Sequence, residues 1–226
     1  MFTQIAHRYD LMNKLMTLGQ DVRWRQEVVR RAALPPGGLL LDLGAGTGDL
    51  AYEAIYQVPD IQVIAADFTI KMMRVGKERL DQSASRLTNP LWTGSDALKL
   101  PFPNQVFDAC ISGFLLRNVT ELDFCLTEQY RVLKQGGVIV SLDTTPPPKS
   151  PLAPVLRFHM HRIIPALGGL IARHQQAYTY LPASTEGFLE PERLAGRFLT
   201  AGFQKVGFRR LMLGTIAIHW GYKPRN

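Results

Sequence analysis

The chain has 226 residues, and 46% of them are hydrophobic, which suits one large α/β domain. The formal net charge of +7 and the isoelectric point near 9.6 favour an anionic partner, unless the charge serves solubility alone. No uninterrupted run of about 18 apolar residues is present, and residues 1–14 lack the basic start and apolar block of a secretory signal. We therefore expect neither a membrane span nor export, but a cytoplasmic location.

The cysteines and histidines give no sign of a metal site. Cys110 lies in a strand-like stretch and Cys125 in a helix-like one, and both are expected to be reduced packing residues. No Cys/His group has the spacing of a zinc site, so no metal is expected. His219 lies in the last strand-like stretch and is expected to be structural.

Strand-like and helix-like stretches alternate along most of the chain. Apolar residues recur at helical spacing before residue 34, the Pro-Pro-Gly-Gly of 35–38 ends that helix, and short apolar runs indicate strands. In chain order, the pattern predicts a helical N-terminal cover (1–33), a strand (39–43), a helix to about 57, a strand (61–67), a helix (69–82), a weak strand (91–96), a strand (107–113), a helix (121–134), a strand (136–143), a helix (190–203) and two closing strands (205–213 and 215–223).

The order of these elements predicts the fold class. Strands that alternate with helices pair in parallel through right-handed crossovers, whereas the two closing stretches are close enough to form only an antiparallel hairpin. This is the arrangement of the class I methyltransferases, with a Rossmann-like seven-stranded sheet whose last strand is antiparallel. We expect a single domain over 1–226, in which 144–190 is a helical insertion over the active site at the carboxyl edge of the sheet.

A glycine-rich loop, Gly-Ala-Gly-Thr-Gly-Asp, occupies residues 44–49 between a strand and a helix. A dinucleotide-binding loop has glycine at the last of these positions, where a pyrophosphate meets the helix N-terminus. Here Asp49 takes that position and Asp42 precedes the loop, so two carboxylates oppose an anion. The loop therefore favours a nucleotide without phosphate that carries positive charge, and S-adenosylmethionine, with its sulfonium and ammonium, fits.

Two more carboxylates end the next two strands. Asp67 follows Gly48 by 19 residues and lies where an acidic residue binds ribose hydroxyls in folds of this shape. Asp96 ends the third strand, where it could accept from the adenine amino group while Ala97 supplies backbone. Each aspartate alone also suits a turn or a cap, but their common placement at strand ends favours a cofactor site.

Seven stretches resemble one family, in order and over nearly the whole chain. They are RYDLMNKLMTLGQDVRWR (8–25), LDLGAGTGD (41–49), ALKLPFPNQVFD (97–108), LRNVTELD (116–123), RVLKQGG (131–137), YTYLPAST (178–185) and TAGFQKVGFRRLMLGTIAIHWGYK (200–223). The Arg-Asn-Val of 117–119 and the Tyr-Asp-Leu-Met-Asn of 9–13 are far more specific than the glycine loop. The chain resembles the ubiquinone/menaquinone biosynthesis C-methyltransferases.

This resemblance implies methyl transfer from S-adenosylmethionine to a ring carbon of a polyprenylated quinol, most simply from demethylmenaquinol to menaquinol, with the ubiquinone pathway as a second possibility. A serine contact of the family is replaced by Gly113, with Ser112 beside it, and the family's Leu-Glu-Phe after the fifth strand reads Leu-Asp-Thr over 142–144. Together the loop, the strand ends and the resemblance predict a cofactor-binding set of Asp42, Gly44, Gly46, Thr47, Gly48, Asp67, Phe68, Asp96, Ala97, Ser112 and Gly113.

Candidate catalytic residues follow from the chemistry of a quinol. Its ring carbon becomes nucleophilic when the neighbouring hydroxyl is deprotonated, so the site needs a base or a cation. Arg117, directly after the fourth strand, is predicted to stabilise the phenolate, unless it pairs with Glu121 instead. Asn118 is expected to orient this loop or to cap the next helix. Tyr9 is expected to pack on the cofactor or ring and His159 to accept a proton, although both also suit ordinary structural roles.

Basic and apolar residues are concentrated in residues 144–185, which contain no Asp or Glu in 42 residues. A polyprenyl tail needs an apolar groove, and anionic lipid headgroups attract cations such as Arg157 and Arg162. We therefore expect this segment to form the entrance for the lipid tail and to contact the anionic inner face of the membrane peripherally. The alternative is a cap that packs on the core and has a solvated basic side.

Other functions fit the sequence less well. Methyltransferases acting on nucleic-acid bases typically have an Asn/Asp-Pro-Pro-aromatic run after the fourth strand, whereas this chain has GFLLRN at 113–118 and no RNA-binding appendage, so no nucleic-acid partner is expected. A methyltransferase of the same fold that acts on another lipid or aromatic small molecule is the main alternative. A non-catalytic relative is favoured only by Gly113. The sequence also leaves a homodimer open.

Overall fold

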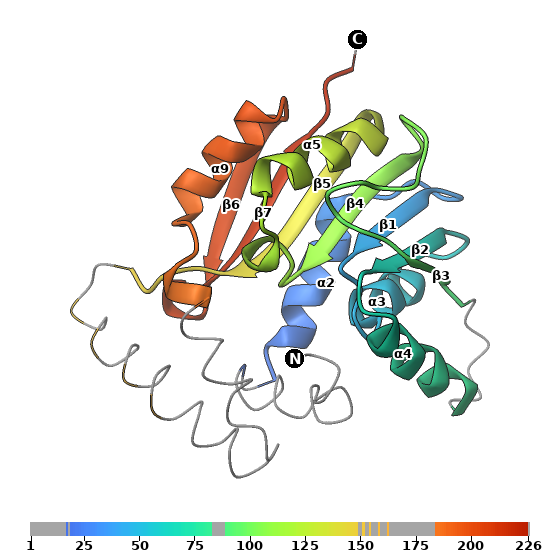
Figure 1. Ribbon diagram of the computed structural model, residues 1–226, viewed down its shortest axis with the longest axis horizontal. Coiled ribbons are helices and arrows are strands. Elements are labelled where there is room, and N and C mark those ends of the chain that lie inside the picture. Colours follow the sequence, from blue (N-terminus) through green and yellow to red (C-terminus); the bar gives the residue numbers. More distant parts are fainter. Residues whose placement is uncertain are drawn as a thin grey trace.

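The computed structural model describes residues 17, 19–82, 89–148, 151, 154, 158, 162 and 184–225. Within these residues, seven strands form one sheet in the order β3-β2-β1-β4-β5-β7-β6 (Figure 1). The strands are β1 (Leu39–Leu43), β2 (Gln62–Asp67), β3 (Leu91–Gly94), β4 (Phe107–Gly113), β5 (Leu133–Thr144), β6 (Gln204–Leu211) and β7 (Ile216–Tyr222).

The pairing of the strands confirms the predicted fold class. β1 to β5 run parallel, whereas β7 is antiparallel both to β5 and to β6. The last strand thus lies between β5 and β6 rather than at the edge. The turn that brings it back, η4 (Met212–Gly214), has three successive residues with positive φ, of 48°, 55° and 87°.

Helices cover both faces of the sheet. They are α2 (Asp21–Ala32), α3 (Asp49–Gln57), α4 (Ile70–Gln82), α5 (Leu122–Val132) and α9 (Pro191–Thr200), with a 3-10 turn, η2 (Leu116–Asn118), before α5. α2 and α3 pack on one face through a core that includes Trp24, Val28, Ala51, Leu40 and Ile111. α5 and α9 pack on the other face through a core that includes Leu126, Phe198, Leu41, Cys110 and Phe107. Neighbours such as Cys110 and Ile111 belong to opposite cores because side chains alternate along a strand.

The helix predicted over 121–134 ends earlier than expected. α5 stops at Val132 and β5 begins at Leu133, which pairs directly with Phe107 of β4. The ammonium of Lys223 donates to the carbonyls of Tyr130 at 2.7 Å and of Leu133 at 2.8 Å. The end of α5 is therefore set by a residue some 90 positions further along the chain, which local sequence patterns do not reveal.

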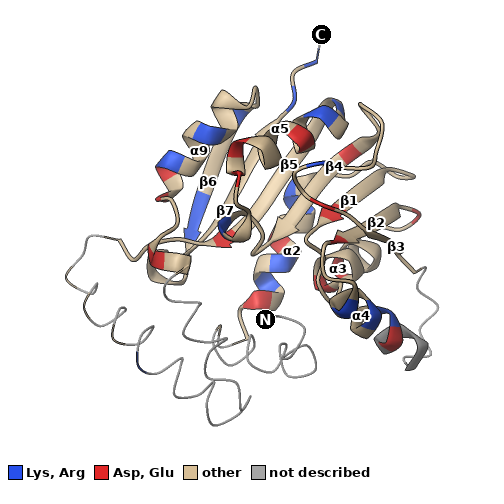
Figure 2. Ribbon diagram, in the orientation of Figure 1, with Lys and Arg blue, Asp and Glu red and all other residues tan. Residues whose placement is uncertain are grey.

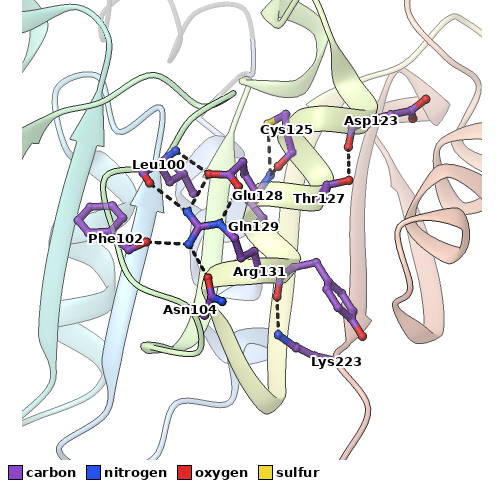
Figure 3. A network of polar contacts seen from close by, with 11 residues as sticks. Leu100, Phe102, Asn104, Asp123, Cys125, Thr127, Glu128, Gln129, Arg131 and Lys223 are labelled. Carbon is purple, nitrogen blue, oxygen red and sulfur yellow. Dashed lines mark hydrogen bonds and ion pairs between the residues drawn. The ribbon is translucent and has the colours of Figure 1, made fainter.

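Arg131, in the last turn of α5, anchors the loop that follows β3 (Figure 3). Its guanidinium donates to both carboxylate oxygens of Glu128, to the carbonyls of Leu100 (3.0 Å) and Phe102 (2.8 Å), and to Asn104 Oδ1 (2.8 Å). Glu128 also accepts from the Leu100 amide at 2.8 Å. These bonds join two of the stretches that carry the family resemblance, 97–108 and 131–137, and hold the loop that begins with Ser95.

Part of the predicted insertion and of the N-terminal cover lies outside the described residues. Within the described part, Thr145 continues β5 with an amide bond to the Thr215 carbonyl at 2.9 Å, and Thr185 donates to Thr144 Oγ1 at 3.0 Å. Thr144, Thr145 and Thr185 of the predicted 144–190 segment thus lie beside the carboxyl end of β5. In the described chain, no helix has the length and apolar character that crossing a membrane requires.

Candidate functional site

The glycine loop is fixed between β1 and β2. The amides of Gly44 and Ala45 donate to the carbonyl of Ala66 at 2.8 and 3.0 Å. Gly44 has φ of 72°, and a Cβ there would lie 2.9 Å from the side chain of Leu115. A side chain at this position would therefore be strained and would also crowd the space that the loop encloses.

Two adjoining hollows lie around this loop at the carboxyl edge of the sheet. Their volumes are about 460 Å³ and about 90 Å³. Both are lined by Gly44, Gly46, Met72, Gly113 and Phe114. We call them the larger and the smaller cavity, and their common lining residues show that they lie next to each other.

The larger cavity contains the two strand-end aspartates. The Asp67 carboxylate accepts from the amide of Gly46 at 2.7 Å and from that of Thr69 at 2.6 Å, which fixes its orientation. Asp96 Oδ1 accepts from the Leu98 amide at 2.9 Å. Each carboxylate oxygen can accept a further bond, so both side chains can serve hydroxyl or amino donors of a ligand.

Phe68 and Ala97, two further residues of the predicted cofactor-binding set, also line the larger cavity. Phe68 lines the larger cavity and is 80% exposed, so its ring is available to cover a ligand. Ala97 lies beside Asp96 in the loop that Arg131 anchors. The Asp67 carboxylate can accept from ribose hydroxyls, Asp96 can accept from an amino group, and the Phe68 ring can cover a base, so this cavity fits an adenosine.

The smaller cavity is rich in charge. It is lined by Asp21 and Arg25 of α2, Asp42 of β1 and Asp49 of α3, together with Thr47. The Arg25 guanidinium bonds to Asp49 at 2.6 Å and to Asp21 at 2.9 Å. Asp49 therefore has a cationic neighbour that the sequence did not reveal, and this neighbour reduces the repulsion that Asp49 exerts on anions. The cavity still has more acidic than basic side chains on its described wall.

Asp42 lacks a partner for one of its oxygens. Oδ2 accepts from the Ala51 amide at 3.0 Å, whereas the buried Oδ1 has no hydrogen-bond partner among the described residues. Burial raises the pKa of the Asp42 carboxyl to about 8, and the nearby carboxylates of Asp67 and Asp49 add to this shift. A carboxyl in this situation is stabilised in its charged form by a cationic ligand, which a sulfonium compound provides.

Arg117 pairs with Asp143 rather than with Glu121. Its Nη1 donates to Asp143 Oδ1 at 2.5 Å, and its backbone amide donates to Oδ2 at 3.2 Å. Both side chains are nearly fully buried, at 6% and 2% exposure, and Arg117 still lines the larger cavity. The buried Nε has no acceptor among the described residues. Asp143 thus fixes the guanidinium, while its Nε–H group has no acceptor among the described residues.

Asn118 holds the backbone of the same loop. Its amide donates to the carbonyl of Phe114 at 2.7 Å, and the Phe114 amide donates to the Leu142 carbonyl at 2.7 Å. Phe114 has φ of 59°, a conformation that is costly for a bulky residue and persists only where the surrounding contacts hold it. This contact supports the loop-orienting role expected for Asn118.

Several predicted residues lie elsewhere. Ser112 is fully buried, bonds to Ser141 Oγ at 3.1 Å and lines neither cavity, whereas Gly113 lines both. Gly48 lines neither cavity and precedes α3 with φ of 84°. Tyr9 and His159 lie outside the described residues.

His219 is structural, as predicted: it is 2% exposed, and its Nε2 lies 3.0 Å from the carbonyl of Pro191. The residues that sequence reasoning missed are Asp21, Arg25 and Asp143. Asp143 could have been found from its place at the end of a central strand, but the two residues of α2 gave no such signal.

Comparison with solved structures shows the class of protein. The chain superposes on phosphoethanolamine N-methyltransferase 2 of Haemonchus contortus in complex with S-adenosyl-L-methionine with a TM-score of 0.65 and 15% identity, over 90% of this chain and 53% of that one, so it spans about half that protein's length. An S-adenosylmethionine-dependent methyltransferase of Thermotoga maritima gives a TM-score of 0.66 at 17% identity, over 98% and 97% of the two chains. The fold is that of the S-adenosylmethionine-dependent methyltransferases.

The family follows from the sequence comparisons. The model of the ubiE/COQ5 methyltransferase family matches residues 1–223. The chain is 47% identical to the ubiquinone/menaquinone biosynthesis C-methyltransferase UbiE of Desulfotalea psychrophila, over 99% of this chain and 89% of that protein. It is 41% identical to the demethylmenaquinone methyltransferase of Thermus thermophilus, over 99% and 100% of the two chains. The chain belongs to the ubiE/COQ5 methyltransferase family, which confirms the predicted resemblance, the enzyme class and the cofactor, S-adenosylmethionine.

Proposed function

We propose that the protein methylates a ring carbon of a polyprenylated quinol, most simply converting demethylmenaquinol to menaquinol, and that it also accepts the corresponding precursor of ubiquinone. The relatives named above carry these activities in their names. The observation that carries the proposal is the buried Arg117–Asp143 pair on the wall of the larger cavity. It supports the proposal because a guanidinium on this wall can stabilise a phenolate that forms beside the cofactor.

The two cavities divide the cofactor between them in this proposal. Asp67 accepts from the ribose hydroxyls, Asp96 and Ala97 meet the adenine edge, and Phe68 covers it. The smaller cavity takes the methionine end. When bound, the cofactor supplies an electrophilic methyl group on a sulfonium, and the protein contributes alignment, which is worth up to about 7–11 kcal/mol of a barrier.

Arg117 acts on the quinol in this proposal. An arginine guanidinium acts as a cation and not as a base, so Arg117 stabilises the phenolate and does not remove the proton. Asp143 accepts one bond from the Arg117 guanidinium and one from the Arg117 backbone amide, and the Nε of Arg117, which has no acceptor among the described residues, is proposed to donate to the quinol oxygen. Asn118 positions the loop, while Tyr9 and His159, both outside the described residues, are proposed to cover the ring and to accept the proton.

The test is transfer of a labelled methyl group from S-adenosylmethionine to reduced demethylmenaquinol, followed by extraction and mass spectrometry. We expect a labelled menaquinol from the wild type. Arg117→Gln should lower turnover by about 10²–10³-fold while calorimetry shows unchanged binding of S-adenosylhomocysteine. Label that enters a different lipid or aromatic product, with none in the quinol, would favour the alternative substrate class.

Peripheral contact with the anionic inner face of the cytoplasmic membrane is part of the same proposal. The segment 144–185 contains no acidic residue, and two of its described residues, Phe158 and Arg162, are exposed. An exposed aromatic ring and a nearby cation in sequence suit a headgroup surface.

Sedimentation with vesicles tests this contact. Arg162→Glu should weaken binding to phosphatidylglycerol vesicles and leave the weak binding to phosphatidylcholine vesicles unchanged. Arg225→Glu serves as the matched control, because Arg225 is exposed beyond the end of β7 that pairs with the start of β5, at the opposite edge of the sheet. Equal binding of both variants to the anionic vesicles contradicts the membrane contact. Light scattering of the protein without vesicles would show whether it is a homodimer.

A further inference from the structure

Helix α4 has an exposed basic face beside the larger cavity. Lys71, Arg74 and Lys77 are all exposed, and Figure 2 shows the basic positions of α4 close together along the helix. None of the three side chains forms an ion pair with another residue that the structure describes. Glu78 is the only acidic residue of α4 whose side chain is described, so positive charge is in excess on this face.

The same face of α4 exposes an apolar side chain. Ile70, in the first turn, is 57% exposed, whereas Met72 and Met73 on the inner side of the helix are buried. Arg74 follows Ile70 by four positions and Lys77 follows Arg74 by three, so the three residues share one side of the helix. The outer face of α4 therefore combines an apolar side chain with cations.

The turn between β6 and β7 exposes a second apolar side chain. Leu213 is 67% exposed although it has φ of 55°, a conformation that is costly for a bulky residue. The turn lies at the carboxyl end of β5, where Thr144 pairs with Ile216. In Figure 1, α4 and this turn both lie towards the lower side of the molecule, at the edge of the sheet that holds the two cavities. Ile70 and Leu213 are thus exposed at the same edge.

The inner side of α4 is fixed against the glycine loop. Met72 lines both cavities, and Phe68, just before the helix, lines the larger one. A Cβ at Gly76 would lie 2.5 Å from the carbonyl oxygen of Thr47, so the helix and the loop are in direct backbone contact. The Tyr52 hydroxyl also donates to the Gly76 carbonyl at 2.9 Å. A surface that binds the outer face of α4 is therefore held next to the larger cavity.

An anionic lipid bilayer matches the charge and the apolar groups of this edge. The exposed arginines of β6 pair with carboxylates, Arg209 with Glu27 and Arg210 with Glu192, whereas the cations of α4 have no such partner in the described chain. Unpaired cations attract anionic headgroups, and exposed apolar side chains enter the boundary beneath them. A polyprenylated quinol is dissolved in a bilayer, so it reaches the larger cavity most directly when this edge meets the membrane.

We propose that the outer face of α4, formed by Ile70, Lys71, Arg74 and Lys77, docks together with Leu213 on an anionic lipid bilayer, so that the larger cavity opens towards the membrane. This inference rests on the membrane contact proposed above, and it adds a contact surface outside the segment 144–185. The three cations contact the lipid phosphates, whereas Ile70 and Leu213 enter the boundary region below them.

Sedimentation with vesicles of phosphatidylglycerol and phosphatidylcholine in equal parts tests the proposal. We expect these vesicles to bind the wild type, and to bind the double variant Arg74→Gln/Lys77→Gln about 10- to 50-fold more weakly. Ile70→Ser/Leu213→Ser should weaken binding about 10-fold, and this loss should persist at high salt, which screens only the charges. Unchanged affinity for S-adenosylhomocysteine by calorimetry shows that each variant is folded.

Arg30→Gln/Arg225→Gln is the matched control. It removes the same charge from exposed residues near the opposite edge of the sheet, in the last turn of α2 and after β7, and it should bind the vesicles as the wild type does. Equal weakening by this control would overturn the proposal, because that result indicates an effect of net charge alone. Wild-type binding by Arg74→Gln/Lys77→Gln, with loss of binding in Arg162→Glu, would overturn it and retain the contact of 144–185. Absence of wild-type binding to these vesicles would overturn both.

Turnover gives a second measurement. Arg74→Gln/Lys77→Gln should methylate a quinol without a prenyl tail in solution at the wild-type rate, but a polyprenylated quinol in the vesicles about 10-fold more slowly. Wild-type turnover of the variant with the vesicle-bound quinol would contradict an opening of the cavity towards the membrane. Failure of the wild type to methylate either quinol would instead reject the proposed substrate, and vesicle binding would still decide the docking.

Discussion

Replacement of Arg131 tests whether a single side chain of α5 anchors the adenine side of the site. The guanidinium uses five N–H groups in five bonds, three of them to the loop at Leu100, Phe102 and Asn104 (Figure 3). The same loop begins with Ser95 and Asp96 on the cavity wall. Arg131→Ala leaves these acceptors and Glu128 without their donor, whereas Arg131→Lys keeps the charge but loses the fork.

The magnitude follows from the contacts. Hydrogen bonds to a charged group contribute about 1.5–3 kcal/mol each when buried, but they are not additive, and the Arg131 side chain is 29% exposed. We therefore expect Arg131→Ala to lower the free energy of unfolding by about 2–4 kcal/mol and Arg131→Lys by about half as much. Arg197→Ala is the control, because Arg197 and its partner Asp123 are 49% and 60% exposed, and such pairs contribute at most about 1 kcal/mol.

Urea unfolding followed by circular dichroism measures these differences, and calorimetry of the folded variants measures the affinity for S-adenosylhomocysteine. Arg131→Lys should bind it more weakly than the wild type, since the loop that carries Asp96 loses its anchor. A loss of stability no larger than that of Arg197→Ala, with unchanged affinity, would refute the anchoring role.

Three further predictions concern buried charges. The pKa of Asp42 is raised to about 8, so between pH 4 and 8 the folded protein holds this proton while the unfolded chain does not, and the free energy of unfolding falls as pH rises through that window. Because a cationic ligand lowers this pKa, binding of S-adenosylmethionine near pH 7 should release a proton. Calorimetry in buffers of different ionisation enthalpy detects this proton, and Asp42→Asn should not release it. Burial lowers the pKa of His219 to about 4, so the free energy of unfolding should fall by about 3 kcal/mol as pH falls from 6.5 towards 4. His219→Gln should lose stability less steeply over that range, and an acid-unfolding profile identical to that of the wild type would contradict this. Asp143→Asn should lower turnover by about 10²-fold with little change in cofactor affinity, because Arg117 loses its ionised partner, whereas Asp143→Glu should keep part of the wild-type turnover. Asp108→Asn is the control, because it breaks a half-exposed pair with Lys134, and it should leave turnover unchanged.

The parts of the fold that depend on local pattern could be predicted from the sequence. The strands are short apolar runs bounded by turn residues, and the short connection between the last two allowed only an antiparallel hairpin. Asp67 and Asp96 were found because the ends of neighbouring parallel strands meet at one edge of the sheet. These inferences need only the period of each element and its direction.

The parts that depend on tertiary contacts could not be predicted. The sequence suggests Glu121, four positions away, as a partner for Arg117, but Arg117 binds Asp143, which is 26 positions away and lies on the next strand of the sheet. Ser112 was placed in the site beside Gly113, but a shift of one residue along a strand reverses the face, and Ser112 points to Ser141 instead. Arg25 reaches the site only because α2 packs against α3, which no sequence spacing encodes.

The position of the transferred methyl group tests the central claim most directly. Reduced demethylmenaquinol is incubated with the protein and S-adenosylmethionine that carries a carbon-13 methyl group, and the product is examined by nuclear magnetic resonance. The account predicts a labelled methyl bonded to a ring carbon, with transfer that requires the reduced quinol. A labelled methyl ether on the quinol oxygen would contradict methylation of the ring carbon, and equal transfer to the oxidised quinone would contradict the role given to the Arg117-stabilised phenolate.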